Sequence, residues 1–141
     1  MRHAAASRVS RMAVPLACII VLAGVSAATA ADRGFPYDSV LLLEAKPMKG
    51  SKRIPVLQIE SKGEAAAIDL WCNRVQAQLV VVDNTITILL GASTEKQCDT
   101  DHMQADADLA AALQQVATWR RDGDLLVLQG ERSLRFHLSS H

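Results

Sequence analysis

Two cysteines, Cys72 and Cys98, are the residues of this sequence best suited to chemistry by type and spacing. A reactive thiol needs a neighbouring base, and a zinc site needs further thiolate or imidazole ligands at short spacing. The sequence around the two cysteines supplies neither. A third cysteine, Cys18, lies in an apolar N-terminal stretch that we expect to be removed. The remaining pair is therefore predicted to form a disulfide in an oxidising compartment.

A cluster of acidic residues is the one other group that suggests chemistry. Asp99, Asp101, His102 and Asp106 combine carboxylates with an imidazole, which can bind divalent ions. Helix capping accounts for the same acids, so we predict no metal and no other cofactor. The C-terminal Ser139-Ser140-His141 is interpreted as a tail, because no oriented acid, base and nucleophile can be identified there. The sequence thus predicts no catalytic residue, and the protein is not expected to be an enzyme.

Trp71 is the candidate for contact with a partner. If Cys72 points into the core, the alternation of a strand directs Trp71 to the opposite face. An exposed tryptophan is a frequent anchor for a protein partner. The alternative is that Trp71 is covered by the 46–55 loop or by Trp119. An exposed apolar patch around Trp71 would favour the binding hypothesis.

The N-terminal residues have the organisation of a secretory signal peptide. Three arginines without an acid precede an apolar run, Met12–Val25, and small residues follow at Ala28-Thr29-Ala30. Residues 1–30 are therefore predicted to be cleaved, which places the protein in the periplasm or outside the cell. The apolar run is shorter than the roughly 20 residues of a membrane span, so no stable span is expected after cleavage. A lipid anchor at Cys18 is not expected, because the hydrophobic run continues past it.

Removal of this leader makes the chain acidic. The 141 residues carry 15 basic and 15 acidic side chains, and the leader takes away three arginines, which leaves 12 against 15 and a net charge of −3. No basic stripe remains, so nucleic acid is not an expected partner. A chain of this length forms one domain.

Alternating hydrophobicity predicts antiparallel strands through the first half of the mature chain. The strands are expected at Val40–Leu43, Val56–Glu60, a stretch ending at Trp71-Cys72-Asn73, Leu79–Val82 and Thr85–Leu90. A polar turn is expected at Ser61–Glu64 and a tight hairpin at Asp83-Asn84. The 46–55 segment, with its prolines and four basic side chains, is predicted to be a solvated connection.

The second half is predicted to contain one helix and a three-strand meander. Asp101 and Gln104 resemble a capping box near the helix start, and an alanine-rich run continues to Ala117. Leu109, Leu113 and Val116 form the stripe that docks, while Asp106 and Gln114 are expected on the exposed face. The meander follows from Trp119-Arg120-Arg121, the hairpin dipeptide Asp122-Gly123, and strands at Asp124–Gln129 and Ser133–Leu138, with His137 facing solvent.

The order of these segments resembles the META/HslJ-like domain family. Members carry a Gly-Cys-Asn step, a Ser-Thr-x-x-x-Cys step, a helix and a closing hairpin. Here the matching motif residues are Cys72, Asn73, Ser93, Thr94 and Cys98. Two departures occur: Trp71 stands where the family has glycine, and Gln76-Ala77-Gln78 replaces a glycine that normally follows Cys-Asn. Glycine permits conformations or close approaches that larger residues resist, so a surface near this turn is expected to differ.

The resemblance implies an α+β fold with a curved antiparallel β-sheet packed around one main helix. It divides the chain into the signal peptide at 1–30, an N-terminal strand and connecting loop at 31–55, and the META/HslJ-like domain at 56–138. Members are secreted or envelope-associated bacterial proteins loosely connected with envelope stress, and they have no established catalytic activity.

Two classes of function follow from this evidence. The first is a non-enzymatic periplasmic or secreted domain that binds an unknown envelope or protein partner, or serves as an accessory in envelope stress. The alternative is a small-ligand-binding protein or a hydrolase inhibitor acting in the envelope. A concave pocket with convergent polar groups would favour a small ligand.

Overall fold

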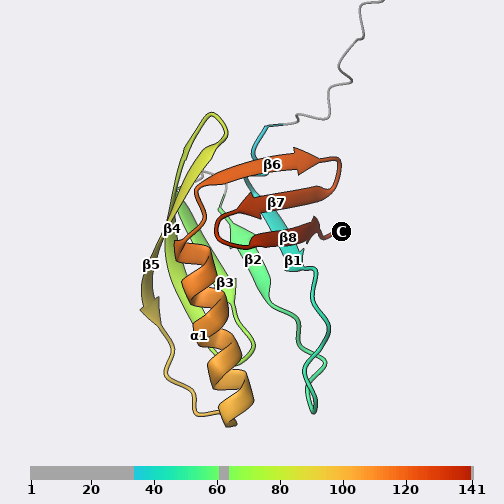
Figure 1. Cartoon of the computed structure of the whole chain (residues 1–141), viewed down its shortest axis with the longest axis vertical. Helices are drawn as coiled ribbons and strands as arrows, with labels where there is room; N and C mark the ends of the chain where they lie inside the picture. Colours follow the sequence, from blue (N-terminus) through green and yellow to red (C-terminus); the bar gives the residue numbers. More distant parts are fainter. Residues whose placement is uncertain (1–33, 61–63, 141) are drawn as a thin grey trace, which may run out of the picture.

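The computed structural model of the chain describes residues 34–60 and 64–140. Within these residues eight antiparallel strands form a closed barrel in sequence order, accompanied by one helix (Figure 1). The elements are β1 (Ser39–Leu43), β2 (Val56–Ile59), β3 (Ala65–Asp69), β4 (Arg74–Val82), β5 (Thr85–Ser93), α1 (Thr100–Gln114), β6 (Thr118–Asp122), β7 (Leu125–Gln129) and β8 (Ser133–Leu138). The predicted leader, Cys18 and most of the predicted 61–64 turn lie outside the described residues.

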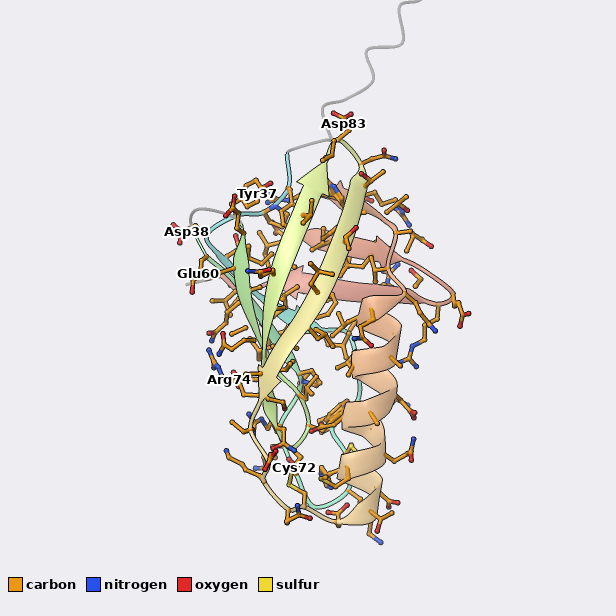
Figure 2. The ribbon with its side chains drawn as sticks, turned by 90° about the vertical axis from the view of Figure 1, so that its left-hand side faces the viewer. Tyr37, Asp38, Glu60, Cys72, Arg74 and Asp83 are labelled. Carbon is orange, nitrogen blue, oxygen red and sulfur yellow. A yellow bond between two sulfur atoms is a disulfide. The ribbon has the colours of Figure 1, made fainter. Side chains whose placement is uncertain are left out.

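The predicted fold class, a curved sheet packed around a main helix, is wrong. The sheet closes on itself because β1 pairs with β8, with Leu42 opposite His137. The helix is not the centre of the fold: α1 follows β5 and lies beside it (Figures 1 and 2). In the sequence α1 lies between β5 and β6. These two strands share the single register pair Thr85 and Thr118, fewer than any other neighbouring pair of strands in the barrel. The helix therefore supplements the barrel wall at this seam.

Alternation along each strand fills the barrel interior. In β4 the side chains of Val75, Ala77 and Leu79 are buried while the intervening glutamines face solvent. In β8 the inward residues Leu134 and Phe136 are buried, as predicted. Successive strand residues point to opposite faces, so one face of every strand lines a single core. A strand is present at each predicted place, but three of them have clearly different bounds. β3 ends at Asp69, before the predicted Trp71-Cys72-Asn73 end; β4 begins at Arg74, before the predicted Leu79; and β5 continues to Ser93, beyond the predicted Leu90.

Two tight turns join the hairpins, and residues able to adopt a positive φ form them. The predicted Asp83-Asn84 hairpin is confirmed, with φ of 51° at Asp83. The second turn is shifted by one residue from the prediction: Asp122 pairs with Leu125 and Gly123 has φ of 59°. Figure 2 shows Asp83 at one end of the barrel and Cys72 at the other.

The helix begins and ends differently from the prediction. Asp99 is the N-cap, and its side chain accepts a hydrogen bond from the His102 N–H, so the expected capping box at Asp101 is wrong. The helix ends at Gln114, short of Ala117. Leu109 and Leu113 are buried as predicted. Asp106 is buried as well, although its charge suggested the exposed face.

Of the residues that the structure describes, none belongs to a helix with the length and hydropathy that a membrane crossing requires.

Candidate partner-binding groove

The turn between β3 and β4 gathers the residues of the predicted family motif. Cys72 is buried in this turn and forms the predicted disulfide with Cys98, an exposed residue of the loop between β5 and α1. The Leu70 N–H donates to the Asn73 carbonyl at 2.7 Å and closes the turn. The disulfide therefore joins the β3–β4 turn to the segment that leads into the helix.

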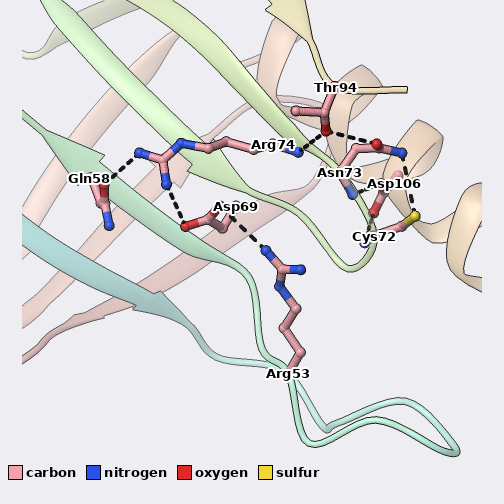
Figure 3. Close-up of polar contacts among 8 residues, drawn as sticks. All are labelled: Arg53, Gln58, Asp69, Cys72, Asn73, Arg74, Thr94 and Asp106. Carbon is pink, nitrogen blue, oxygen red and sulfur yellow. Dashed lines mark hydrogen bonds and ion pairs between the residues drawn. The ribbon is translucent and has the colours of Figure 1, made fainter. Parts of the chain in front are cut away.

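The Asn73 side chain fixes the same loop by three further hydrogen bonds. Its Oδ1 accepts from the Thr94 hydroxyl at 2.8 Å (Figure 3) and from the Lys96 N–H at 2.7 Å, and its Nδ2 donates to the Lys96 carbonyl at 3.3 Å. Thr94 in turn accepts from the Arg74 N–H at 3.0 Å. The Ser93 hydroxyl makes only a local bond, to the Thr94 carbonyl. Asn73 and Thr94 thus satisfy backbone groups at the turn and in the loop.

Asp106 of α1 also bonds to this turn, a role that its predicted place on the exposed face of the helix did not anticipate. Its two carboxylate oxygens accept separate hydrogen bonds, from the Cys72 N–H at 2.9 Å and from the Asn73 N–H at 2.8 Å. A signal was present in the sequence, because Asp106 lies three residues before Leu109 and seven before Leu113, on the stripe that docks. The buried carboxylate ties α1 to the β3–β4 turn.

The polar groups of the motif therefore bond to one another. The buried side-chain nitrogen and oxygen atoms of the described residues all have hydrogen-bond partners. A group already engaged in this way has less capacity to bind a ligand or abstract a proton. The cluster of Cys72, Asn73, Thr94, Cys98 and Asp106 is a structural lock that holds the turn, the loop and the helix together.

An ion-pair network lies on the outer face beside this lock (Figure 3). The Arg74 guanidinium contacts the Asp69 carboxylate at 3.0 Å and donates to Gln58 Oε1 at 2.8 Å. Arg53 approaches the same carboxylate at 3.4 Å. These partly exposed groups link the outward side chains of β2, β3 and β4 to Arg53, with two guanidinium groups sharing the single Asp69 carboxylate.

Trp71 lies in the turn itself and is half-buried, which differs from the predicted position on a strand face. It is not covered by Trp119, which is buried elsewhere, with its ring 5.1 Å from Phe35 and its Nε1 donating to the Asp83 carbonyl. Trp71 borders an open groove of about 350 Å³ between the helix and the ends of β1 and β8. The lining residues are Leu43, Glu44, Ala45, Trp71, Ala105, Asp108, Leu109, Arg132, Ser133, Leu134 and Arg135. We call this surface the Trp71 groove.

The Trp71 groove has an apolar floor and a charged rim. Leucines from β1, α1 and β8 form the floor with the indole. On the rim, Glu44 Oε2 lies 2.9 Å from Arg135 Nε and 2.9 Å from His137 Nε2. The hydrogen bond from Arg135, and then that from His137, holds the pKa of the Glu44 carboxyl below its usual value. Glu44 is therefore ionised and paired at neutral pH. Arg132, the other arginine on the rim, makes one hydrogen bond among the described residues, to the Asp108 backbone carbonyl at 3.1 Å.

The acidic cluster of Asp99, Asp101, His102 and Asp106 is divided between the helix N-terminus and the β3–β4 turn. Asp99 accepts from the His102 backbone N–H at 3.0 Å and contacts its Nδ1 at 2.6 Å, whereas Asp106 points to the β3–β4 turn. Within residues 34–60 and 64–140 no group of three or more histidine, cysteine or acidic side chains has the arrangement to hold a metal ion. The hydrogen bonds from the His102 backbone and ring lower the pKa of Asp99.

Asp99→Ala is expected to lower the urea midpoint of unfolding at pH 7, because the helix loses its N-cap acceptor. Since the pKa of Asp99 is lower in the folded chain, its stabilisation is fully present above pH 3.8, its ordinary value, and is lost as the pH falls through the folded value. Urea titrations between pH 7 and pH 2.5 measure this. Asp99→Ser, a neutral cap, is the control and should retain most of the midpoint; equal midpoints for all three proteins at pH 7 would contradict the capping role.

Comparisons with known proteins agree with this fold. A sequence model described as the META domain matches residues 33–140. An NMR structure of a protein from Burkholderia xenovorans superimposes with a TM-score of 0.60 at 18% identity, covering 74% of this chain and 84% of that one. A second NMR structure gives a TM-score of 0.55 at 18% identity, covering 72% of this chain and 89% of the other. A search of curated proteins found no significant match. At these identities the structural similarity establishes the fold alone.

Proposed function

Because this chain belongs to the META domain family, we propose that it is a non-enzymatic periplasmic or secreted domain that binds an envelope protein through the Trp71 groove. The observation that carries the proposal is the contrast between the two sites at this end of the barrel. The structural lock uses its polar groups internally, whereas the groove presents an indole, an apolar floor and charged groups to solvent. A concave apolar surface with a polar rim is the usual form of a binding site.

The cellular location is part of the proposal. It is supported by the signal-peptide pattern of residues 1–30 and by a disulfide between the two cysteines that would remain after cleavage. The resemblance described above motivates assigning the protein to envelope stress, as a binding or accessory component.

Site-specific photo-crosslinking tests the groove as a binding surface. A crosslinking amino acid is placed at Ala105, which lines the groove, or at Ala111, an exposed position of the same helix outside it. The protein is expressed with its own N-terminus and irradiated in the cell envelope. We expect a discrete protein adduct at Ala105 that disappears in Trp71→Ala and is absent at Ala111, because loss of a central aromatic anchor typically costs about 2 kcal/mol or more, roughly thirtyfold in affinity. Identical adducts at both positions, or an adduct indifferent to Trp71, would contradict the proposal.

A small ligand is the second candidate, favoured by one observation. The groove volume of about 350 Å³ lies at the lower end of the range of roughly 300–1,000 Å³ typical of small-molecule sites. Native mass spectrometry of the protein recovered from the envelope distinguishes the two. A bound mass of a few hundred daltons, lost in Trp71→Ala, would favour the small ligand. An adduct with a hydrolase whose activity falls would specify an inhibitor.

A further inference from the structure

We infer that the partner segment of the Trp71 groove is an acidic peptide stretch with an apolar anchor residue, and that the basic loop of residues 46–53 steers it into place. This inference rests on the proposed function of the groove. The charges around the groove favour a partner segment with negative charge.

The loop between β1 and β2 concentrates positive charge. Lys46, Lys49, Lys52 and Arg53 occur within eight exposed or partly exposed residues that contain no acid. Outside this loop the described residues carry six basic side chains against fourteen acidic ones. Arg53 pairs with Asp69 at 3.4 Å, and the three lysines have no ion pair among the described residues. The positive field is therefore local, in an otherwise acidic protein, and its lysines have unused charge.

This loop is continuous with the groove. Ala45, which lines the groove, directly precedes Lys46. The loop extends from β1 toward the same end of the molecule as the N-terminal half of α1 (Figures 1 and 2), and the β3–β4 turn lies between them in Figure 1. A segment that occupies the groove and extends past Ala45 would consequently run along the lysines.

The opposite rim adds to the same preference. Arg132, in the β7–β8 turn, uses one guanidinium nitrogen on a backbone carbonyl and can donate its others to a carboxylate. Of the two rim acids, Glu44 is already paired with Arg135 and His137. The Asp108 carboxylate accepts from the neutral Gln104 amide at 2.8 Å and keeps its negative charge. Cations therefore flank the groove on two sides, Arg132 on this rim and the three lysines in the adjoining loop, against one rim acid without an ion pair among the described residues, Asp108.

The apolar floor selects a peptide over a lipid surface. Leu43, Leu109 and Leu134 lie with Trp71 in a recess, which a protruding side chain can enter. A bilayer presents a plane, and its headgroups would meet the lysines without reaching this floor. A single leucine, phenylalanine or tryptophan flanked by carboxylates satisfies both the recess and the rim.

Selection from a library of random twelve-residue peptides tests the inference. The full-length exported protein is immobilised, and enriched peptides are resynthesised with a fluorophore for anisotropy titrations at 50 mM and 500 mM NaCl. Three proteins are compared with the parent: Trp71→Ala; the loop variant Lys46→Gln, Lys49→Gln, Lys52→Gln; and a control, Gln76→Glu, Gln78→Glu, Thr87→Glu. The control makes the same change of −3 in net charge at exposed positions of β4 and β5, away from the groove. Vesicles of phosphatidylglycerol form a separate arm.

We expect enriched peptides with several acids around one large apolar residue. Trp71→Ala should abolish binding, the loop variant should weaken it about tenfold at 50 mM NaCl and much less at 500 mM, and the control should remain within about twofold. Peptides that depend on Trp71 but lack an acidic excess would overturn this inference and leave the proposed function standing. The absence of any Trp71-dependent peptide would count against both. Vesicle binding that falls in the loop variant and is unchanged in Trp71→Ala would show that the loop contacts lipid, and would also overturn it.

Discussion

Asp106→Asn is expected to lower the free energy of unfolding by about 3 kcal/mol, measured by urea denaturation at pH 7. The carboxylate accepts one hydrogen bond at each oxygen, from the Cys72 N–H and the Asn73 N–H. An asparagine keeps one acceptor oxygen and places an amide donor against the other N–H. Because the site is buried, water cannot replace the lost partner, and the change carries the full cost of an unsatisfied donor.

Asp108→Asn is the matched control for this prediction. It makes the same chemical change two residues away on α1, where the exposed carboxylate contacts only the Gln104 side chain at 2.8 Å among the described residues. Exposed pairs of this spacing contribute less than about 0.5 kcal/mol. Similar losses for the two variants would show that Asp106 does not hold the β3–β4 turn, and that removal of either charge disturbs the helix in a general way.

The positions of the strands along the chain were predictable because the residue pattern of each strand reflects its own burial. The alternating hydrophobicity of Val56–Ile59 and Ser133–Leu138 predicts which side chains are buried, and in the structure these side chains lie in the barrel interior. Asp83 identifies its hairpin because a tight turn requires a positive φ that few residues adopt. Such signals are local, and they do not depend on which strands become neighbours.

Closure of the barrel was not predictable from these patterns. A strand with one buried face has the same alternation in an open sheet packed against a helix and in a barrel lined by side chains. The difference lies in the pairing of β1 with β8, for example Leu43 with Phe136, across almost the whole described chain. No periodicity in the sequence reports a contact at that separation, so the helix was assigned a central position that the barrel interior occupies.

At the β3–β4 turn, the disulfide was predicted from the sequence, whereas the buried Asp106 carboxylate beside it was not. Cysteine pairing follows from residue type, whereas Asp106 was assigned to solvent on charge alone, against its position on the docking stripe. Burial of an aspartate is tolerated here because two backbone N–H groups converge on it. Turn geometry creates that pair of donors, and turn geometry is set by contacts that a sequence pattern does not contain.

The departure from the family pattern at Trp71 acquires a structural meaning. Glycine, which the resemblance led us to expect at that position, would remove the indole from the groove, so the proposed binding surface depends on the tryptophan found there. The second departure is accommodated on the outside, because Gln76 and Gln78 are exposed on β4. The register between β4 and β5 is irregular around Gln76. Val75 pairs with Ser93 and Ala77 pairs with Leu90, so β5 has one more residue than β4 there, in the stretch that contains Gly91.

Reduction of the Cys72–Cys98 disulfide is expected to lower the free energy of unfolding by about 3–4 kcal/mol, with the barrel still folded. The bond closes a loop that contains β4 and β5, at a sequence separation of 26 residues. In the chain-entropy model, opening a loop of this length gives the unfolded chain enough freedom for a loss of that size. Asn73 and Asp106 keep their hydrogen bonds in the reduced protein, so the native turn should persist.

Urea denaturation of oxidised protein, reduced protein and the double variant Cys72→Ala, Cys98→Ala measures the effect. The reduced protein and the double variant should share a midpoint below that of the oxidised protein, and near-UV circular dichroism in buffer should remain native for all three. Equal midpoints in oxidised and reduced protein would contradict a stabilising crosslink. A native near-UV spectrum lost on reduction would mean that the hydrogen bonds of the structural lock cannot hold the β3–β4 turn alone, and that the covalent bond determines its conformation as well as its stability.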